Sequence, residues 1–174
     1  MKIYLAGSIP KGDRVRGVWY DWRRRYQEVL TTISDVEILN ADDLKDETNS
    51  FKVFGHDALM IKRADIVIVN AEKEIGKGIG VGTAQEMVIA KYFARPVLTV
   101  VPKDTHHRRS DVVFHGVLIH DWIHPFIDTF SDFTADSIEN CIGWIQKYRS
   151  HRKRARIKDI TIIDMGREYF LEHK

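Results

Sequence analysis

Residues 66–69 have the sequence IVIV, and residues 78–86, one loop later, have the sequence GIGVGTAQE. The first segment is β-branched throughout and does not alternate with polar residues, which is typical of a strand covered on both faces of a sheet. The second segment is a glycine-rich turn that enters a helix, which we predict to open at Thr83. A buried strand, a glycine-rich turn and a helix together indicate one unit of a parallel α/β sheet.

The same alternation of strand and helix continues along most of the chain. Apolar runs predict strands at residues 3–6, 36–39, 66–69, 96–101 and 117–119, with a further possible strand at 160–163. Helical spacing predicts helices over residues 19–33, from a cap at Asn49 or Ser50, from Thr83, and over 138–148. We therefore expect a Rossmann-like (flavodoxin-like) doubly wound α/β fold, with a parallel five-stranded sheet and helices on both faces.

Size, charge and cysteine content exclude several classes of protein. A chain of 174 residues is long enough for one domain with a full core. Its 27 basic residues nearly balance 25 acidic ones, so the net charge of +2 implies no overall attraction to nucleic acid or to a membrane. The single cysteine, Cys141, excludes an internal disulfide. With no signal peptide and no apolar stretch of membrane-spanning length, we expect a cytoplasmic protein.

We divide the chain into an α/β domain, residues 1–150, and a basic C-terminal extension, residues 151–174. The extension opens with the sequence HRKRAR and is expected to pack on the domain or at an oligomer interface. An exposed basic run is usually a solvated surface, so nucleic acid is not an expected partner.

The glycine-rich turn is the first candidate for a ligand site. In doubly wound sheets, ligands bind beyond the carboxyl ends of the strands, near the point where the strand order reverses. Glycines allow close backbone approach, and Glu86 is expected on the first turn of the following helix, where the helix dipole favours its ionised form. An ionised carboxylate beside an open cleft suits attack on an anomeric carbon. By spacing alone, the alternative is a phosphate loop with Glu86 stabilising the helix.

Three segments, taken together, resemble the nucleoside 2-deoxyribosyltransferase family, which includes the related 2′-deoxynucleoside 5′-phosphate N-hydrolases. They are YLAGSI at residues 4–9, Asp57 with Ile61 and the ADIVI sequence at 64–68, and GTAQE at 82–86. The resemblance implies cleavage of the N-glycosidic bond of a nucleoside or its 5′-monophosphate through a covalent glycosyl intermediate. The sugar then passes to another base or to water.

The resemblance also implies roles for individual residues. Glu86 resembles the family nucleophile, and Asp57 resembles the acid that helps to protonate the leaving base. The remaining candidates for substrate contact near the cleft are Tyr4, Gly7, Ser8, Ile9, Gly80, Gly82 and Thr83. The structural alternatives are a core position for Tyr4 and a surface position for Asp57.

The sequence departs from the family pattern next to the nucleophile. Many deoxyribosyltransferases have an acidic residue six positions before it and the hydrolases often have serine, whereas this chain has Gly80. Met87 replaces the small residue that frequently follows the nucleophile. The absence of a carboxylate at position 80 favours an anionic substrate, a 5′-monophosphate.

A basic loop follows the fourth predicted strand. Ser110 resembles a serine that reaches the 5′-phosphate in a neighbouring subunit of the hydrolases, and Arg108 and Arg109 would add charge-assisted contacts. The alternative is a solvated basic loop. His106 and His107 precede these residues, but adjacent residues rarely ligate one ion, so neither a metal nor another cofactor is expected.

We expect a homo-oligomer, a dimer or larger, with composite active sites that the aromatic segment 122–130 helps to close. Two other functions stay open. One is a phosphoribohydrolase of the cytokinin-activating type, whose loop also ends in Gly-Thr-x-x-Glu but normally begins with Pro-Gly-Gly, which is absent here. The other is a non-catalytic nucleotide-binding module on the same fold.

Overall fold

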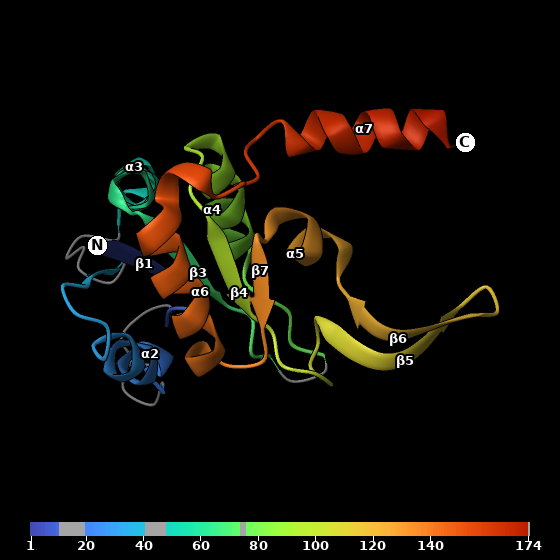
Figure 1. The fold of residues 1–174 in the computed structure, drawn as a ribbon, viewed down its shortest axis with the longest axis horizontal. Helices are drawn as coiled ribbons and strands as arrows, with labels where there is room; N and C mark the ends of the chain where they lie inside the picture. The colour runs from blue at the N-terminus through green and yellow to red at the C-terminus, as the bar shows by residue number, and fades with distance from the viewer. Residues whose placement is uncertain (11–19, 41–47, 74–75, 174) are drawn as a thin grey trace.

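The computed structural model describes residues 1–10, 20–40, 48–73 and 76–173. Its centre is a five-stranded sheet (Figure 1), formed by β1 (Lys2–Ala6), β2 (Glu37–Asn40), β3 (Ile66–Asn70), β4 (Val97–Val100) and β7 (Phe133–Ala135). All neighbouring strands are parallel, in the order β2-β1-β3-β4-β7. This is the flavodoxin-like order, so the predicted fold class is confirmed.

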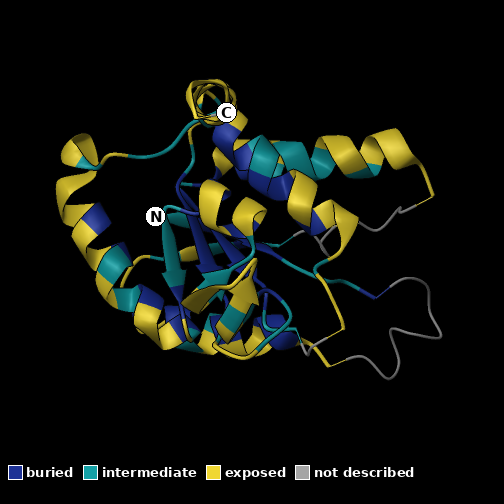
Figure 2. Ribbon diagram, turned by 90° about the vertical axis from the view of Figure 1, so that its right-hand side faces the viewer, coloured by how far each residue is buried: buried dark blue, intermediate teal, exposed yellow. Residues whose placement is uncertain are grey.

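Helices cover both faces of the sheet. One face carries α2 (Trp22–Leu30) and α6 (Ile138–His151), and the other carries α3 (Ser50–Arg63), α4 (Val81–Tyr92) and α5 (Pro125–Phe130). Successive side chains of a strand point to opposite faces, so Ile3 and Leu5 of β1 pack in the first layer and Tyr4 and Ala6 in the second. Figure 2 shows the buried residues gathered in the sheet and on the helix sides that face it.

The N-terminal ends of α3 and α4 determine where the candidate site residues on these helices lie. The Asn49 side chain accepts a hydrogen bond from the backbone N–H of Lys52 at 3.0 Å, which confirms Asn49 as the predicted cap of α3. Helix α4 begins at Val81 with Gly80 as its N-cap, two residues before the predicted start. Glu86 therefore lies on the second turn of α4, and its predicted place on the first turn was wrong.

The predicted fifth strand at residues 117–119 does not belong to the sheet. It is part of β6 (Val117–Ile123), which pairs antiparallel with β5 (Arg108–Phe114) in a separate hairpin. His115 and Gly116 both have positive φ, 50° and 83°, as the tight turn of a two-residue hairpin requires. The hairpin also replaces most of the basic loop that was predicted after the fourth strand, and β7 takes the fifth place in the sheet.

The C-terminal extension contains a short 3-10 helix, η2 (Arg152–Arg154), and α7 (Ile162–Glu172). The possible strand at 160–163 was wrong, because a turn there leads into α7. Figure 1 shows α7 and the β5–β6 hairpin projecting from the body on the same side. Both carry exposed apolar side chains, among them Leu118 in the hairpin and Phe170 in α7. Across the described ranges, no helix is long and apolar enough to cross a membrane.

Asp132, in the turn before β7, joins three parts of the chain. Its Oδ2 atom accepts hydrogen bonds from the Nζ of Lys91 in α4 and, at 2.7 Å, from the backbone N–H of Val97 in β4. Its Oδ1 atom accepts from the backbone N–H of Lys158 in the extension at 2.8 Å. Lys91 is fully buried, and this burial lowers its pKa while the carboxylate of Asp132 opposes the shift. Asp132, with Lys91, is therefore a buried polar link between the sheet, α4 and the C-terminal extension.

Candidate active site

A cleft of about 640 Å³ opens at the carboxyl end of β1. Three segments form it: the loop after β1, one side of α3, and the start of α4. The strand order reverses at β1, so the cleft lies where a doubly wound sheet binds its ligands. Eight of the residues selected from the sequence line it: Gly7, Ser8, Ile9, Asp57, Gly80, Gly82, Thr83 and Glu86. The sequence had not indicated the other lining residues, Ser50, Val53, Phe54, Val81, Gln85 and Ile89.

The carboxyl group of Glu86 is the most buried acid in this cleft. The residue is 9% exposed, and its Oε1 atom accepts a hydrogen bond from the Tyr4 hydroxyl at 2.5 Å. Burial, reinforced by the negative charges of Glu86 and Asp57, raises the pKa of Tyr4 well above its usual value. The Tyr4 hydroxyl thus stays protonated at neutral pH and remains a donor that orients the Glu86 carboxylate. Tyr4 lies behind Glu86 and is not one of the residues that line the cleft.

Asp57 projects from α3 into the same cleft. It is half-buried, and its Oδ1 atom lies 3.3 Å from Nδ1 of His56, a residue that the sequence did not indicate. The charges of both Asp57 and Glu86 act on the Tyr4 hydroxyl. Two carboxyl groups in different surroundings therefore face one cleft, as a pair with separate acid and nucleophile roles requires.

Close packing fixes the loop after β1. A Cβ atom on Gly7 would lie 2.4 Å from the Trp22 ring, so no other residue fits there without moving the indole. The Trp22 Nε1–H group also donates to the carbonyl oxygen of Ser8 at 2.9 Å. From the sequence, Trp22 was only a core residue of a helix, and its contact with the cleft loop depends on how α2 packs on the sheet.

Arg23 is a further residue that the sequence did not indicate. It is 1% exposed, and its guanidinium lies 5.6 Å from the centre of the Trp22 ring. Its positive charge acts on the Tyr4 hydroxyl and opposes the upward shift of the Tyr4 pKa. Arg23 stands first in a run of three arginines, and a run of charges is normally a solvated helix face, so nothing in the pattern marks it as buried.

Arg108, Arg109 and Ser110 lie on β5, outside the residues that line the cleft. Nε and Nη2 of Arg108 each donate to the Asp121 carboxylate at 2.7 Å, and Nη1 donates to Asp136 at 2.6 Å. The Arg108 guanidinium thus ties the base of the hairpin to the end of β7. Any role of these residues at a phosphate would have to be played in a neighbouring subunit. From the sequence, Lys11 and Arg14 are two further basic residues expected to contact a 5′-phosphate, and both lie outside the described residues.

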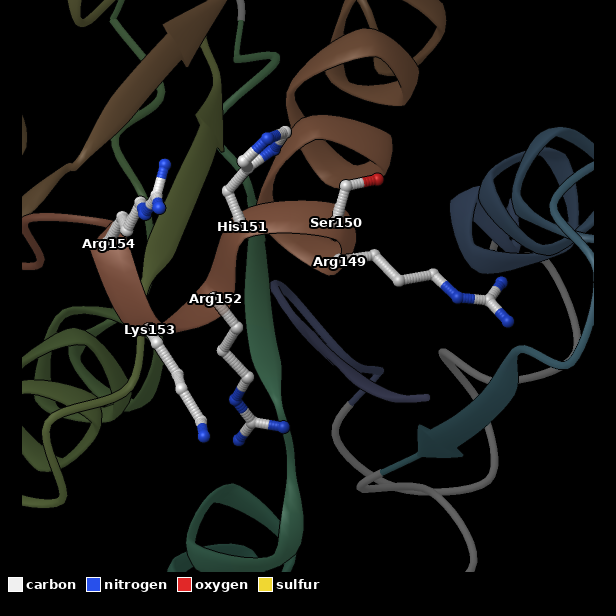
Figure 3. Close-up of a pocket in the computed structure, with 6 residues that line it drawn as sticks. All are labelled: Arg149, Ser150, His151, Arg152, Lys153 and Arg154. Carbon is white, nitrogen blue, oxygen red and sulfur yellow. The ribbon is translucent and has the colours of Figure 1, made fainter.

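The basic run forms a second hollow, of about 540 Å³, lined by Arg149–Arg154 (Figure 3). Arg149 donates to the carbonyl oxygen of Ser34 at 2.7 Å, and Arg152 pairs with Asp65 at 2.7 Å. Asp65 precedes β3, so this hollow lies at the amino ends of the strands, away from Glu86. In Figure 3, the side chains of Arg152 and Lys153 point one way and those of His151 and Arg154 the other, so they do not converge on one ligand.

Within the described ranges, no group of three or more histidine, cysteine, aspartate or glutamate side chains is placed to hold a metal ion. A hydrogen-bonded, buried carboxylate next to glycines that leave room for a ligand suits nucleophilic attack on a small substrate. Apart from its own neighbours in the chain and helix, a Cβ atom placed on Gly80 or Gly82 would have no described atom within 4 Å.

Solved structures share this fold. The 2-desoxiribosyltransferase from Leishmania mexicana aligns with a TM-score of 0.53 at 18% identity, over 86% of this chain and 97% of that one. A conserved protein from Enterococcus faecalis V583 aligns with a TM-score of 0.59 at 13% identity, over 84% and 97%. No protein-family model and no curated protein sequence matches this chain. The fold expected from the resemblance is thus the fold of a solved deoxyribosyltransferase.

Proposed function

We propose that this protein cleaves the N-glycosidic bond of a deoxynucleoside or its 5′-monophosphate, as nucleoside 2-deoxyribosyltransferases and N-hydrolases do. The observation that carries the proposal is the Glu86 carboxylate, held by Tyr4 at the floor of a cleft that Asp57 shares. The family resemblance of three sequence segments and the fold shared with a solved deoxyribosyltransferase support it.

The reaction follows from the two carboxyl groups. Glu86 attacks C1′ of the sugar and forms a glycosyl ester, while the C1′–N bond breaks and its electron pair moves to the base. Asp57 supplies a proton to the departing base. A second base or a water molecule then attacks C1′ and gives its proton to Asp57, which is now ionised, while the Glu86 carboxylate leaves. Tyr4 keeps the attacking carboxylate in one orientation throughout.

The loop around Gly80 bears on the substrate. Gly80 and Gly82 leave open space at the start of α4, and a helix N-terminus favours a negatively charged group. Position 80 itself carries no carboxylate that would repel an anion. These features favour a 5′-monophosphate, bound at least as well as the free nucleoside.

The test is a panel of deoxynucleosides, ribonucleosides and their 5′-monophosphates, each incubated with and without a second free base. Chromatography would score the released base and the exchanged nucleoside. We expect base release or exchange from at least one deoxynucleoside or deoxynucleotide. Release without a second base would identify a hydrolase, and exchange that needs one would identify a transferase. No reaction with any member of the panel would contradict the proposal.

We further propose that the active protein is a homo-oligomer. The hairpin and α7 both carry exposed apolar side chains, and so does the cleft rim, where Phe54 is 54% and Val81 is 81% exposed. Patches of this kind on one chain suit contact with a second copy. Within the aromatic segment 122–130, Phe126 is exposed, whereas Phe130 is buried.

Light scattering should therefore give a mass of at least two chains, each of 20.2 kDa. Replacing the exposed residues Leu118 and Phe170 by glutamate should reduce the measured mass to that of a single chain. The far-ultraviolet circular dichroism should not change. A wild-type protein of single-chain mass at working concentration would contradict the oligomer.

A further inference from the structure

Two neighbouring histidines hold the glycine-rich loop that leads into α4. Nδ1 of His106 accepts a hydrogen bond from the backbone N–H of Gly76 at 3.1 Å. Nε2 of His107 accepts one from the backbone N–H of Ile79 at 2.9 Å. The histidines lie between β4 and β5, and the loop lies between β3 and α4. These two bonds, which we name the imidazole clasp, thus join segments about thirty residues apart.

The clasp is tightly packed. The rings of His106 and His107 are nearly perpendicular, with centroids 4.7 Å apart, and His107 meets His124 in the same way at 5.6 Å. A Cβ atom on Gly78 would lie 3.5 Å from Nε2 of His106 and 3.7 Å from Cε1 of His107. The loop therefore lies directly against both rings, and His107 is only 6% exposed.

The hydrogen bonds indicate which ring nitrogen of His107 carries the proton. A neutral imidazole has one donor nitrogen and one acceptor nitrogen, so a ring that accepts at Nε2 carries its hydrogen on Nδ1. That Nδ1 atom is buried and has no hydrogen-bond partner among the described residues. A second proton would have to go to Nε2, where it would end the bond to Ile79.

The surroundings of His107 oppose that second proton. Among the described residues, the titratable groups that act on it are His106 on its own segment and His124 directly after β6, and the loop also carries Glu72, Lys73 and Lys77. Burial, together with the two neighbouring imidazoles, lowers the pKa of His107 from 6.5 to about 4. Because this pKa lies below the ordinary value, the neutral acceptor form survives acidification and is lost only as the pH falls through about 4.

We propose that His106 and His107 are positioning residues: as neutral acceptors they fix the loop that ends at Gly80, the N-cap of α4, and so hold the cleft wall in place against the sugar. Ile79 directly precedes Gly80, and its partly buried side chain packs against the core cluster that includes Met87 and Ala90 of α4. A loop released at Ile79 would let the cleft wall move relative to Glu86. The inference rests on the proposed function for its kinetic test but not for its structural one.

The kinetic test compares two substitutions of His107 at pH 7. His107→Gln places an acceptor oxygen near the former Nε2 position, and His107→Leu removes the acceptor. We expect His107→Leu to lower kcat/KM at least about tenfold, because small misplacements of a reacting centre are costly, and His107→Gln to restore it to within about threefold. His120→Gln is the matched control, because His120 is an exposed hairpin residue, and it should behave as the wild type.

The structural test needs no substrate. In the wild type, the amide signal of Ile79 in a nuclear magnetic resonance titration should follow the protonation of the His107 ring, and the ring nitrogen shifts should report Nδ1–H. In His107→Gln the acid step at Ile79 should be absent. The positioning role is wrong if His107→Leu retains the wild-type rate, or if the Ile79 amide does not respond to His107. If the Ile79 response is present but no base is released from any substrate, the proposed function fails and the clasp stands.

Discussion

Replacing Glu86 by glutamine should lower kcat by on the order of 10³-fold or more, because an amide cannot form the glycosyl ester. Glutamine has nearly the same size, and its Oε1 atom can still accept the hydrogen bond from Tyr4. Since Glu86 is buried against that hydroxyl, an alanine would leave a buried donor without its partner. A loss of activity in that variant could then come from lower stability as well as from the missing nucleophile. The glutamine variant should therefore keep the wild-type melting temperature while it loses turnover.

Base release measured by chromatography gives the rate, and intact-mass analysis with a slow fluorinated sugar substrate tests the intermediate. The wild type should gain the mass of one glycosyl group, and Glu86→Gln should gain none. Glu28→Gln is the control, because Glu28 is an exposed helix residue paired only with Arg24 among the described contacts. If the wild type turns over normally but gains no glycosyl mass, water attacks the sugar directly. That result would overturn the covalent role of Glu86.

The largest effect on stability should come from Asp132→Asn. This change leaves the fully buried ammonium group of Lys91 without its counter-ion. Removing one partner of a buried ion pair typically costs about 3–5 kcal/mol, because the remaining charge is uncompensated. We expect a loss of that size in the free energy of unfolding, measured by urea denaturation at pH 7.

Two further variants sharpen this test. Asp111→Asn changes an exposed hairpin carboxylate and should alter the free energy of unfolding by less than about 0.5 kcal/mol. Combining Asp132→Asn with Lys91→Met removes both charges and should recover a large part of the loss. A loss below about 1 kcal/mol in the single variant would show that the pair is not the buried polar link inferred above.

The sequence predicted the central sheet because its strands are apolar runs between clear turns, and β3 with the glycine-rich loop was the clearest unit. It predicted the cleft because the strand-end loops of this fold meet there. It failed at the fifth strand, because β7 has only three residues and one of them is polar, whereas the longer apolar run of β6 belongs to the hairpin. Deciding between them needed the positive φ angles of His115 and Gly116, which a pattern of apolar residues does not contain.

The supporting residues of the site were harder to predict, because their roles depend on contacts between distant segments. Tyr4 reaches Glu86 across 82 positions in the chain, and His107 reaches Ile79 across 28. Arg23 looked like one member of a solvated basic run, yet the packing of α2 buries it. Residue type and local spacing do not predict contacts between segments that are far apart in the sequence.

Because there is open space at Gly80, a side chain at this position could affect substrate binding without affecting the stability of the fold. Apart from its neighbours in the chain, no described residue lies within 4 Å of a Cβ atom placed there, and the residue is the N-cap of α4 with negative φ. Serine and aspartate are favourable at that position of a helix, so either would be accepted without loss of stability. The same position lines the cleft, and in the proposed reaction a hydroxyl or a carboxylate there would change what the sugar end of a substrate meets. Under the proposed function, a single substitution at Gly80 could therefore change specificity without compensating changes elsewhere in the fold.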